Sequence, residues 1–106
     1  MNNNEQIIQR IVSVVNKTAP QSEVFLYGSR ARGDAGIMSD WDVLILMNKK
    51  KVSFNDETGF MDAFYELELE TGEVLSPLIY AKQEWNKKYT HSPLFENIKR
   101  EGIRIM

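Results

Sequence analysis

The chain has 106 residues, a length expected for one compact domain (residues 1–106) with a single modest core. Its 42% hydrophobic and 26% charged residues are typical of a globular protein and exclude an intrinsically disordered chain. The formal net charge of -2 argues against a protein that coats nucleic acid through its overall charge, so there is no strong nucleic-acid signal. The absence of cysteine excludes disulfides and thiolate metal sites.

No targeting or membrane-spanning segment is visible in the sequence. The first six residues, MNNNEQ, lack the basic region and the apolar core of a signal peptide. No apolar stretch approaches the roughly 18 residues that a membrane-spanning helix requires. We therefore expect a soluble, cytoplasmic domain with no membrane partner.

The first half of the chain predicts alternating helices and strands. Residues 4–17 place apolar side chains at helical spacing, and residues 22–28 form a short apolar run typical of a buried strand. A helical turn is expected near Ser29, followed by a glycine-rich loop. Residues 40–47, DWDVLILM, predict a strand buried on both faces, and residues 55–65 predict a helix.

The segment after this helix allows two interpretations. Residues 66–70, ELELE, alternate strictly, which favours a strand with one solvated face. Gly72 then supplies the turn of a hairpin, and residues 73–80 form the return strand, which Pro77 places at an edge or a bulge. In the alternative, the helix continues to Glu70 and Gly72 is its C-cap. We favour the hairpin.

The end of the chain predicts helices over residues 82–89 and 92–102, followed by a last short strand over residues 103–106. Ser92 is placed to cap the second helix and Pro93 to occupy its first turn. Helices and strands thus alternate along the chain. The fold class is α/β or α+β, with a single mixed β-sheet flanked by helices.

Two carboxylates open the strand at residues 40–47. Because alternate residues of a strand project to the same face, Asp40 and Asp42 point together, while Trp41 points away and packs. Carboxylate oxygens are the ligands that Mg²⁺ prefers. The pair is therefore a candidate metal site suited to nucleotidyl transfer, in which metal ions neutralise phosphates and activate the attacking oxygen.

The loop upstream supplies groups for binding phosphate. Gly28 lets the backbone approach a phosphate closely, and Ser29 adds a hydroxyl at a predicted helix start. Arg30 and Arg32 add charge and forked donors. An isolated D-x-D pair is common in turns, but its conjunction with this loop between two buried strands points to a nucleotide site.

The stretch GSRARGDAGIMSDWDVLIL resembles the signature of the DNA polymerase β-type nucleotidyltransferase superfamily, in which G-S is followed by about ten residues and D-x-D. Its short form is most similar to the minimal nucleotidyltransferases of bacteria and archaea. The resemblance implies the polymerase β-type fold and transfer of a nucleoside monophosphate from an NTP, usually ATP, with Mg²⁺. It further implies that Gly28 and Ser29 hold the triphosphate and that Asp40 and Asp42 are the catalytic, metal-binding residues.

The resemblance also implies a protein partner. Members of this family are often encoded beside, and complexed with, an all-helical HEPN protein. In that setting they act as antitoxins, some of them by adenylylating the partner.

The sequence departs from the family pattern at one position. The superfamily usually supplies a third carboxylate from a later strand, and our alignment places Ser76 there. Glu73 is three residues away on the opposite strand face, and Glu68 and Glu70 reach the site only if the hairpin forms, although a solvated strand face explains them more simply.

Loss of a metal ligand typically slows phosphoryl chemistry by orders of magnitude. Three hypotheses therefore remain open. The chain is a nucleotidyltransferase, or a catalytically weak module of the same fold that neutralises a helical partner by contact, or a small domain with no nucleotide role.

Overall fold

The computed structural model describes residues 3–36 and 38–106. Its elements in chain order are α1 (Asn3–Thr18), β1 (Glu23–Tyr27), α2 (Ser29–Arg32), β2 (Trp41–Met47), α3 (Phe54–Thr71), β3 (Leu75–Ala81), α4 (Lys82–Lys88), α5 (Pro93–Glu101) and β4 (Ile103–Arg104). The strands form one mixed sheet with helices on both sides, so the predicted fold class is confirmed.

The sheet has the strand order β3-β2-β1-β4. β1 runs antiparallel to both β2 and β4, whereas β2 and β3 are parallel and joined through α3. β3 is an edge strand, as Pro77 predicts, because proline has no backbone N–H to donate and is tolerated where one side of the strand is unpaired. β2 lies inside the sheet and is buried on both faces, as its continuous apolar run predicts.

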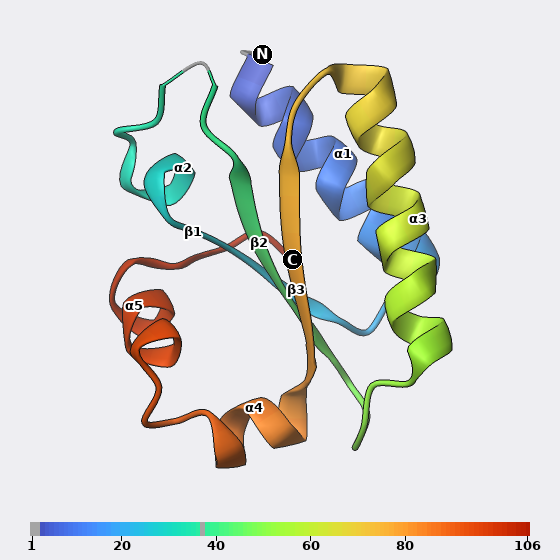
Figure 1. Ribbon diagram of the computed structural model, residues 1–106, viewed down its shortest axis with the longest axis vertical. Helices are drawn as coiled ribbons and strands as arrows, with labels where there is room; N and C mark the ends of the chain where they lie inside the picture. The colour runs from blue at the N-terminus through green and yellow to red at the C-terminus, as the bar shows by residue number, and fades with distance from the viewer. Residues whose placement is uncertain (1–2, 37) are drawn as a thin grey trace.

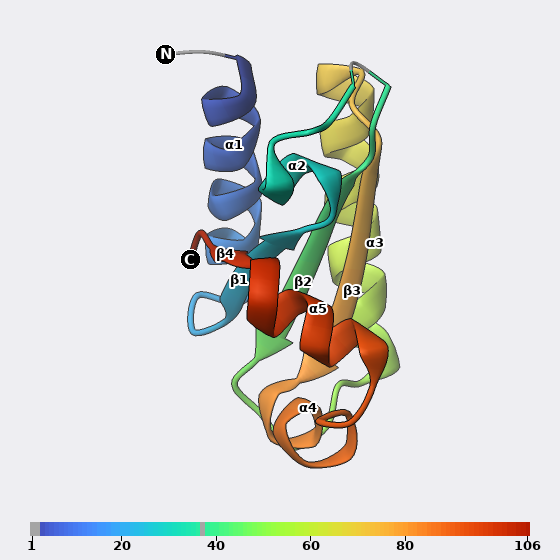
Figure 2. The same ribbon diagram turned by 90° about the vertical axis from the view of Figure 1, so that its left-hand side faces the viewer.

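Two apolar clusters lie on opposite faces of this sheet. On one face, α1 and α3 pack against side chains of β1 and β2 that include Val24, Val43 and Ile45. On the other face, Leu44 and Leu46 pack against α4 and α5. Figure 1 shows α1 and α3 to the right of the sheet and α5 to the left, and Figure 2 shows α2 above α5 on that left-hand side.

The hairpin favoured for residues 66–80 is wrong, and the alternative helix is confirmed. α3 begins at a capping box, in which Ser53 accepts from the backbone N–H of Asp56 and the Asp56 side chain accepts from the Ser53 N–H. It then continues without interruption to Gly72, which caps the helix in the left-handed conformation. The burial of Phe60, Phe64 and Leu67 along one helical face outweighs the short alternating pattern.

The C-terminal predictions are confirmed. Ser92 caps α5 by accepting from the backbone N–H of Phe95, and Pro93 occupies the first turn. β4 then pairs with β1 at the edge of the sheet remote from β3. None of the helices in the described part of the chain is long and apolar enough to cross a membrane.

Candidate functional site

The candidate site lies where β1 ends and the parallel strands β2 and β3 both begin. The register places Tyr27 of β1, Asp42 of β2 and Ser76 of β3 in one row across the sheet. This row lies on the face that carries α4 and α5, because Leu44, two residues after Asp42, packs in the cluster of that face. The three side chains remain partly exposed, since the helices cover only the rows further along the strands.

The two predicted metal ligands, Asp40 and Asp42, share this end of β2. Trp41 between them is 1% exposed and belongs to the cluster on the opposite face, as the strand alternation predicts. The Ser76 hydroxyl donates to Asp40 Oδ2 at 3.2 Å. Asp42 therefore has a serine beside it in register, and the same serine bonds to Asp40.

The negative charges of Asp40 and Asp42 repel each other. Partial burial raises the pKa of Asp42, the neighbouring charge of Asp40 raises it further, and the Arg32 guanidinium partly offsets both effects. Burial and the charge of Asp42 also raise the pKa of the Tyr27 phenol to about 12, so this hydroxyl keeps its proton at neutral pH. The site thus holds two acidic groups whose repulsion a divalent cation would relieve.

Gly28 brings the loop backbone directly against the acidic pair. Its φ is +73°, in the left-handed region, and a Cβ added there would lie 2.3 Å from Asp42 Oδ2. The position therefore requires glycine for both conformation and space. Ser29 follows at the first residue of α2, one residue from this contact.

The two arginines of the loop have different surroundings. The side chain of Arg32 is 44% exposed and forms ion pairs with Asp34 and Glu101, both at 3.2 Å. It is also the cation that lowers the pKa of Asp42. Arg32 thus lies at the rim of the site with its guanidinium accessible.

Arg30, in contrast, lies beneath the loop, where its guanidinium contacts other residues of the chain. Its side chain is 9% exposed, and its guanidinium lies 4.5 Å from the centre of the Trp41 ring. It donates to the Ser39 carbonyl at 2.9 Å and lies 3.5 Å from Glu73, which also accepts from Trp41 Nε1 at 3.2 Å. These contacts hold the residue before Asp40 against the start of β3.

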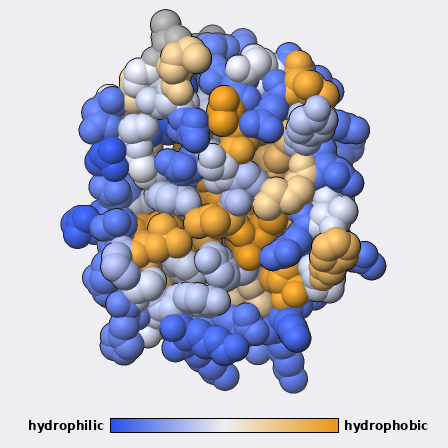
Figure 3. Space-filling view, viewed as in Figure 1, coloured by the Kyte–Doolittle hydropathy of each residue, from blue (hydrophilic) through white to orange (hydrophobic). Residues whose placement is uncertain are grey.

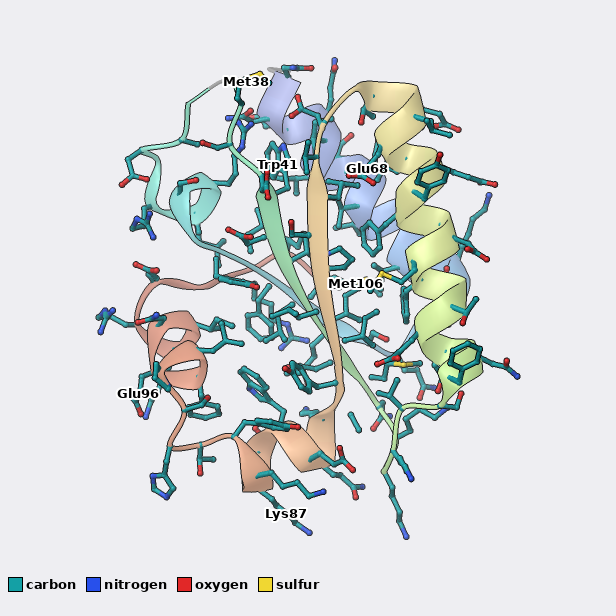
Figure 4. All side chains as sticks on the ribbon, in the orientation of Figure 1. Met38, Trp41, Glu68, Lys87, Glu96 and Met106 are labelled. Carbon is teal, nitrogen blue, oxygen red and sulfur yellow. The ribbon has the colours of Figure 1, made fainter. Side chains whose placement is uncertain are left out.

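The remaining acidic candidates lie elsewhere. Glu68 accepts from the backbone N–H of Leu75, and Glu70 pairs with Arg10 of α1. Figure 4 shows Glu68 on α3, with Trp41 at the start of β2. The hairpin through which these glutamates could have reached the site does not form, and both residues belong to α3.

Among the residues that the structure describes, no third carboxylate joins Asp40 and Asp42 to form a metal-binding group. Within residues 3–36 and 38–106, no group of three histidine, cysteine, aspartate or glutamate side chains is arranged to hold a metal ion. Ser76 occupies the position beside Asp42 at which the alignment expected an acid. At the three positions where the family supplies carboxylates, the site offers Asp40, Asp42 and the hydroxyl of Ser76.

Sequence reasoning missed two features of the site. It gave Tyr27 no place in the site, and only the pairing of β1 with β2 brings Tyr27 beside Asp42. It also missed the contacts among Arg30, Trp41 and Glu73. The hydrogen bond from Trp41 to Glu73 joins residues that are 32 positions apart in the sequence. Neither the pairing nor these contacts have a local sequence signal.

The comparisons with known proteins bear on the family and the fold of the chain. A family model described as "Nucleotidyltransferase domain" matches residues 8–103. No curated protein matches the chain. A solved structure described as "Crystal structure of the toxin-antitoxin with AMP-PNP" is similar in fold, with a TM-score of 0.69 and 14% sequence identity over 93% of this chain and 72% of that chain.

Proposed function

The chain belongs to the nucleotidyltransferase domain family, and from that premise we propose that it binds Mg²⁺-ATP and transfers AMP to a hydroxyl group. The observation that carries this proposal is the approach of Gly28 to the Asp42 carboxylate, which joins the predicted phosphate loop to the predicted metal ligands. The reaction forms a bond between the acceptor oxygen and the α-phosphorus and breaks the bond to the β-phosphate, releasing pyrophosphate.

The residues present fit a divalent cation. Asp40 and Asp42 offer carboxylate oxygens on one face, and burial together with the charge of Asp40 raises the pKa of Asp42. These two side chains would hold Mg²⁺, which supplies charge neutralisation on the phosphates when bound.

The other residues of the site have separate roles in this proposal. Gly28 and Ser29 bind the triphosphate through the backbone and the hydroxyl, and Arg32 adds a positive charge at the exposed rim. Arg30 stays a predicted nucleotide-binding residue whose guanidinium already contacts Trp41, Ser39 and Glu73. In its present contacts it positions the loop that carries Asp40.

A protein partner supplies the acceptor hydroxyl in this proposal. The structure with the similar fold is that of a toxin-antitoxin with AMP-PNP, which supports a role in such a pair. The resemblance of the sequence to minimal nucleotidyltransferases is the basis for proposing that this chain is the antitoxin and that its partner is a helical HEPN-type protein. Both proteins of such a pair would work in the cytoplasm.

The hydroxyl at Ser76 favours a second version of the same function. A serine hydroxyl does not ligate Mg²⁺ as a carboxylate does. It also does not accept the proton of the attacking hydroxyl, so this proton must pass to solvent. In this version the chain binds Mg²⁺-ATP and neutralises its partner by contact, while transfer is slow.

Incubation with α-labelled ATP, Mg²⁺ and the protein encoded by the neighbouring gene tests both versions. We expect transfer of label that Asp42→Asn abolishes. Ser76→Asp is expected to speed transfer by about 10²-fold if Ser76 limits the reaction, because it adds a charged ligand at the reacting centre. Glu96→Gln, an exposed change on α5, is the matched control.

Neutralisation that survives Asp42→Asn with no transfer favours the second version. Failure of the unchanged chain to bind Mg²⁺-ATP by calorimetric titration contradicts both.

A further inference from the structure

The outward face of α3 carries an exposed apolar row. Phe54, Met61, Tyr65 and Leu69 are 80%, 47%, 61% and 69% exposed. Their spacing of seven, four and four residues places them along one side of the helix over about 22 Å. Figure 3 shows apolar residues among hydrophilic ones on the right-hand side of the molecule, where α3 lies.

This row is not the face that α3 uses in the core. Phe60, Phe64 and Leu67 are the buried residues of α3, and their centre lies about 130° around the helix axis from the exposed row. Soluble proteins rarely leave a continuous row of large apolar side chains in water unless it has a binding role. The row is therefore available to another molecule.

Carboxylates flank the row on both sides. α3 contains six acidic residues and no lysine or arginine. Three of the six have partners within the chain: Asp56 with Lys49, Glu68 with the Leu75 N–H, and Glu70 with Arg10.

The other three acidic residues are available to a partner. At 100° per residue, Glu57 lies on one side of the row, and Asp62 and Glu66 lie on the other. Among the residues that the structure describes, none of these three forms an ion pair.

This charge pattern selects among the possible occupants. A second copy packed row against row would bring two acidic helices together, and like charges across such a contact are destabilising. A different protein that presents an apolar row flanked by lysine and arginine would match both the apolar and the charged parts of this face.

We propose that the outward face of α3, defined by Phe54, Met61, Tyr65 and Leu69 with their acidic flanks, is the docking surface for a partner protein with a basic-flanked apolar face. The inference rests on the partner-binding part of the proposed function. It places the docking surface on the side of the sheet opposite Asp40 and Asp42, because α3 and α5 lie on opposite faces.

Titration calorimetry with the protein encoded by the neighbouring gene tests the surface. The double change Met61→Ser with Tyr65→Ser is expected to weaken binding at least tenfold, and Asp62→Lys with Glu66→Lys to weaken it similarly. The matched controls are Ile103→Ser, which removes a 47% exposed apolar side chain at the far edge of the sheet, and Glu96→Lys on α5. Both controls are expected to bind within twofold of the unchanged chain.

Three results would overturn the proposal. Unchanged binding by both double variants would exclude this surface and leave the proposed function intact. Failure of the unchanged chain to bind this protein would contradict the partner-binding part of the proposed function and this surface with it, whereas Mg²⁺-ATP binding would be unaffected. A dimer of the chain alone that Met61→Ser with Tyr65→Ser dissociates, measured by sedimentation, would assign the face to a second copy. Thermal unfolding and Mg²⁺-ATP binding of each variant establish that it is folded.

Discussion

At the scale of single residues, the acidic pair destabilises the ligand-free protein. Burial and the charge of Asp40 raise the pKa of Asp42 above its ordinary value of 3.8. The neutral carboxyl therefore favours the folded state below pH 3.8, and this contribution is lost as the pH rises through the raised pKa. At neutral pH the ionised Asp42 is retained at the expense of stability, as expected of a binding residue.

Replacing Asp42 by asparagine should accordingly stabilise the ligand-free chain while removing a proposed metal ligand. We expect Asp42→Asn to raise Tm at pH 7 by roughly 2–4 °C, the shift that about 0.5 kcal/mol produces in a domain of this length. The difference should shrink as the pH falls toward 3.8. Thermal unfolding followed by circular dichroism across this pH range provides the measurement.

Asp62→Asn is the control, since the Asp62 side chain is exposed and remote from the site. A lower Tm for Asp42→Asn at pH 7 would contradict the electrostatic argument.

At the scale of elements, residues 66–70 distinguish the two interpretations of the sequence, a hairpin strand and a continuation of the helix. In a strand, Leu67 and Leu69 would share one face and one environment. In α3 they diverge, with Leu67 2% exposed in the core and Leu69 69% exposed in water.

The helix thus predicts unequal effects for two identical substitutions. Leu67→Ala should lower the free energy of unfolding by about 2–4 kcal/mol because it leaves a cavity, and Leu69→Ala by less than about 0.5 kcal/mol. Urea titration of the two variants measures both values. Equal losses would favour the strand.

The sequence predicts the elements with strong local signals and fails where distant contacts decide. The buried strand at β2 and the Ser92 cap with Pro93 are local features, and both predictions are confirmed. The helical continuation of α3 depends on the packing of Phe64 and Leu67 against the sheet, which no local alternation reports. The placement of Ser76 beside Asp42 depends on the register of β3, which the family alignment predicts but the residues alone do not.

At the scale of the whole molecule, nucleotide binding at one end of the strands would stabilise the entire domain. Under the proposed function, Mg²⁺-ATP at about one hundred times its Kd should add roughly 2.7 kcal/mol to the free energy of unfolding. This corresponds to a rise in Tm of about 10 °C or more. Scanning fluorimetry with and without EDTA measures the effect, which chelation should abolish.

The rise in Tm caused by Mg²⁺-ATP should persist in the Met61→Ser, Tyr65→Ser variant, since α3 lies across the sheet from Asp42. It should disappear in Gly28→Ala, whose added Cβ would meet the Asp42 carboxylate. A full shift in Gly28→Ala would contradict the assignment of the nucleotide to this loop.

The sheet between α3 and the acidic pair limits the reach of a docked partner. A partner held on the outer face of α3 is separated from Asp40 by the helix and the sheet, which are layers of about 10 Å each. The path around these two layers to Asp40 is roughly 30 Å long. An acceptor hydroxyl on that partner must lie on a tail of about 10 extended residues, or belong to another partner molecule. Under the proposed function, the partner molecule that is held and the partner molecule that is modified can therefore be different copies.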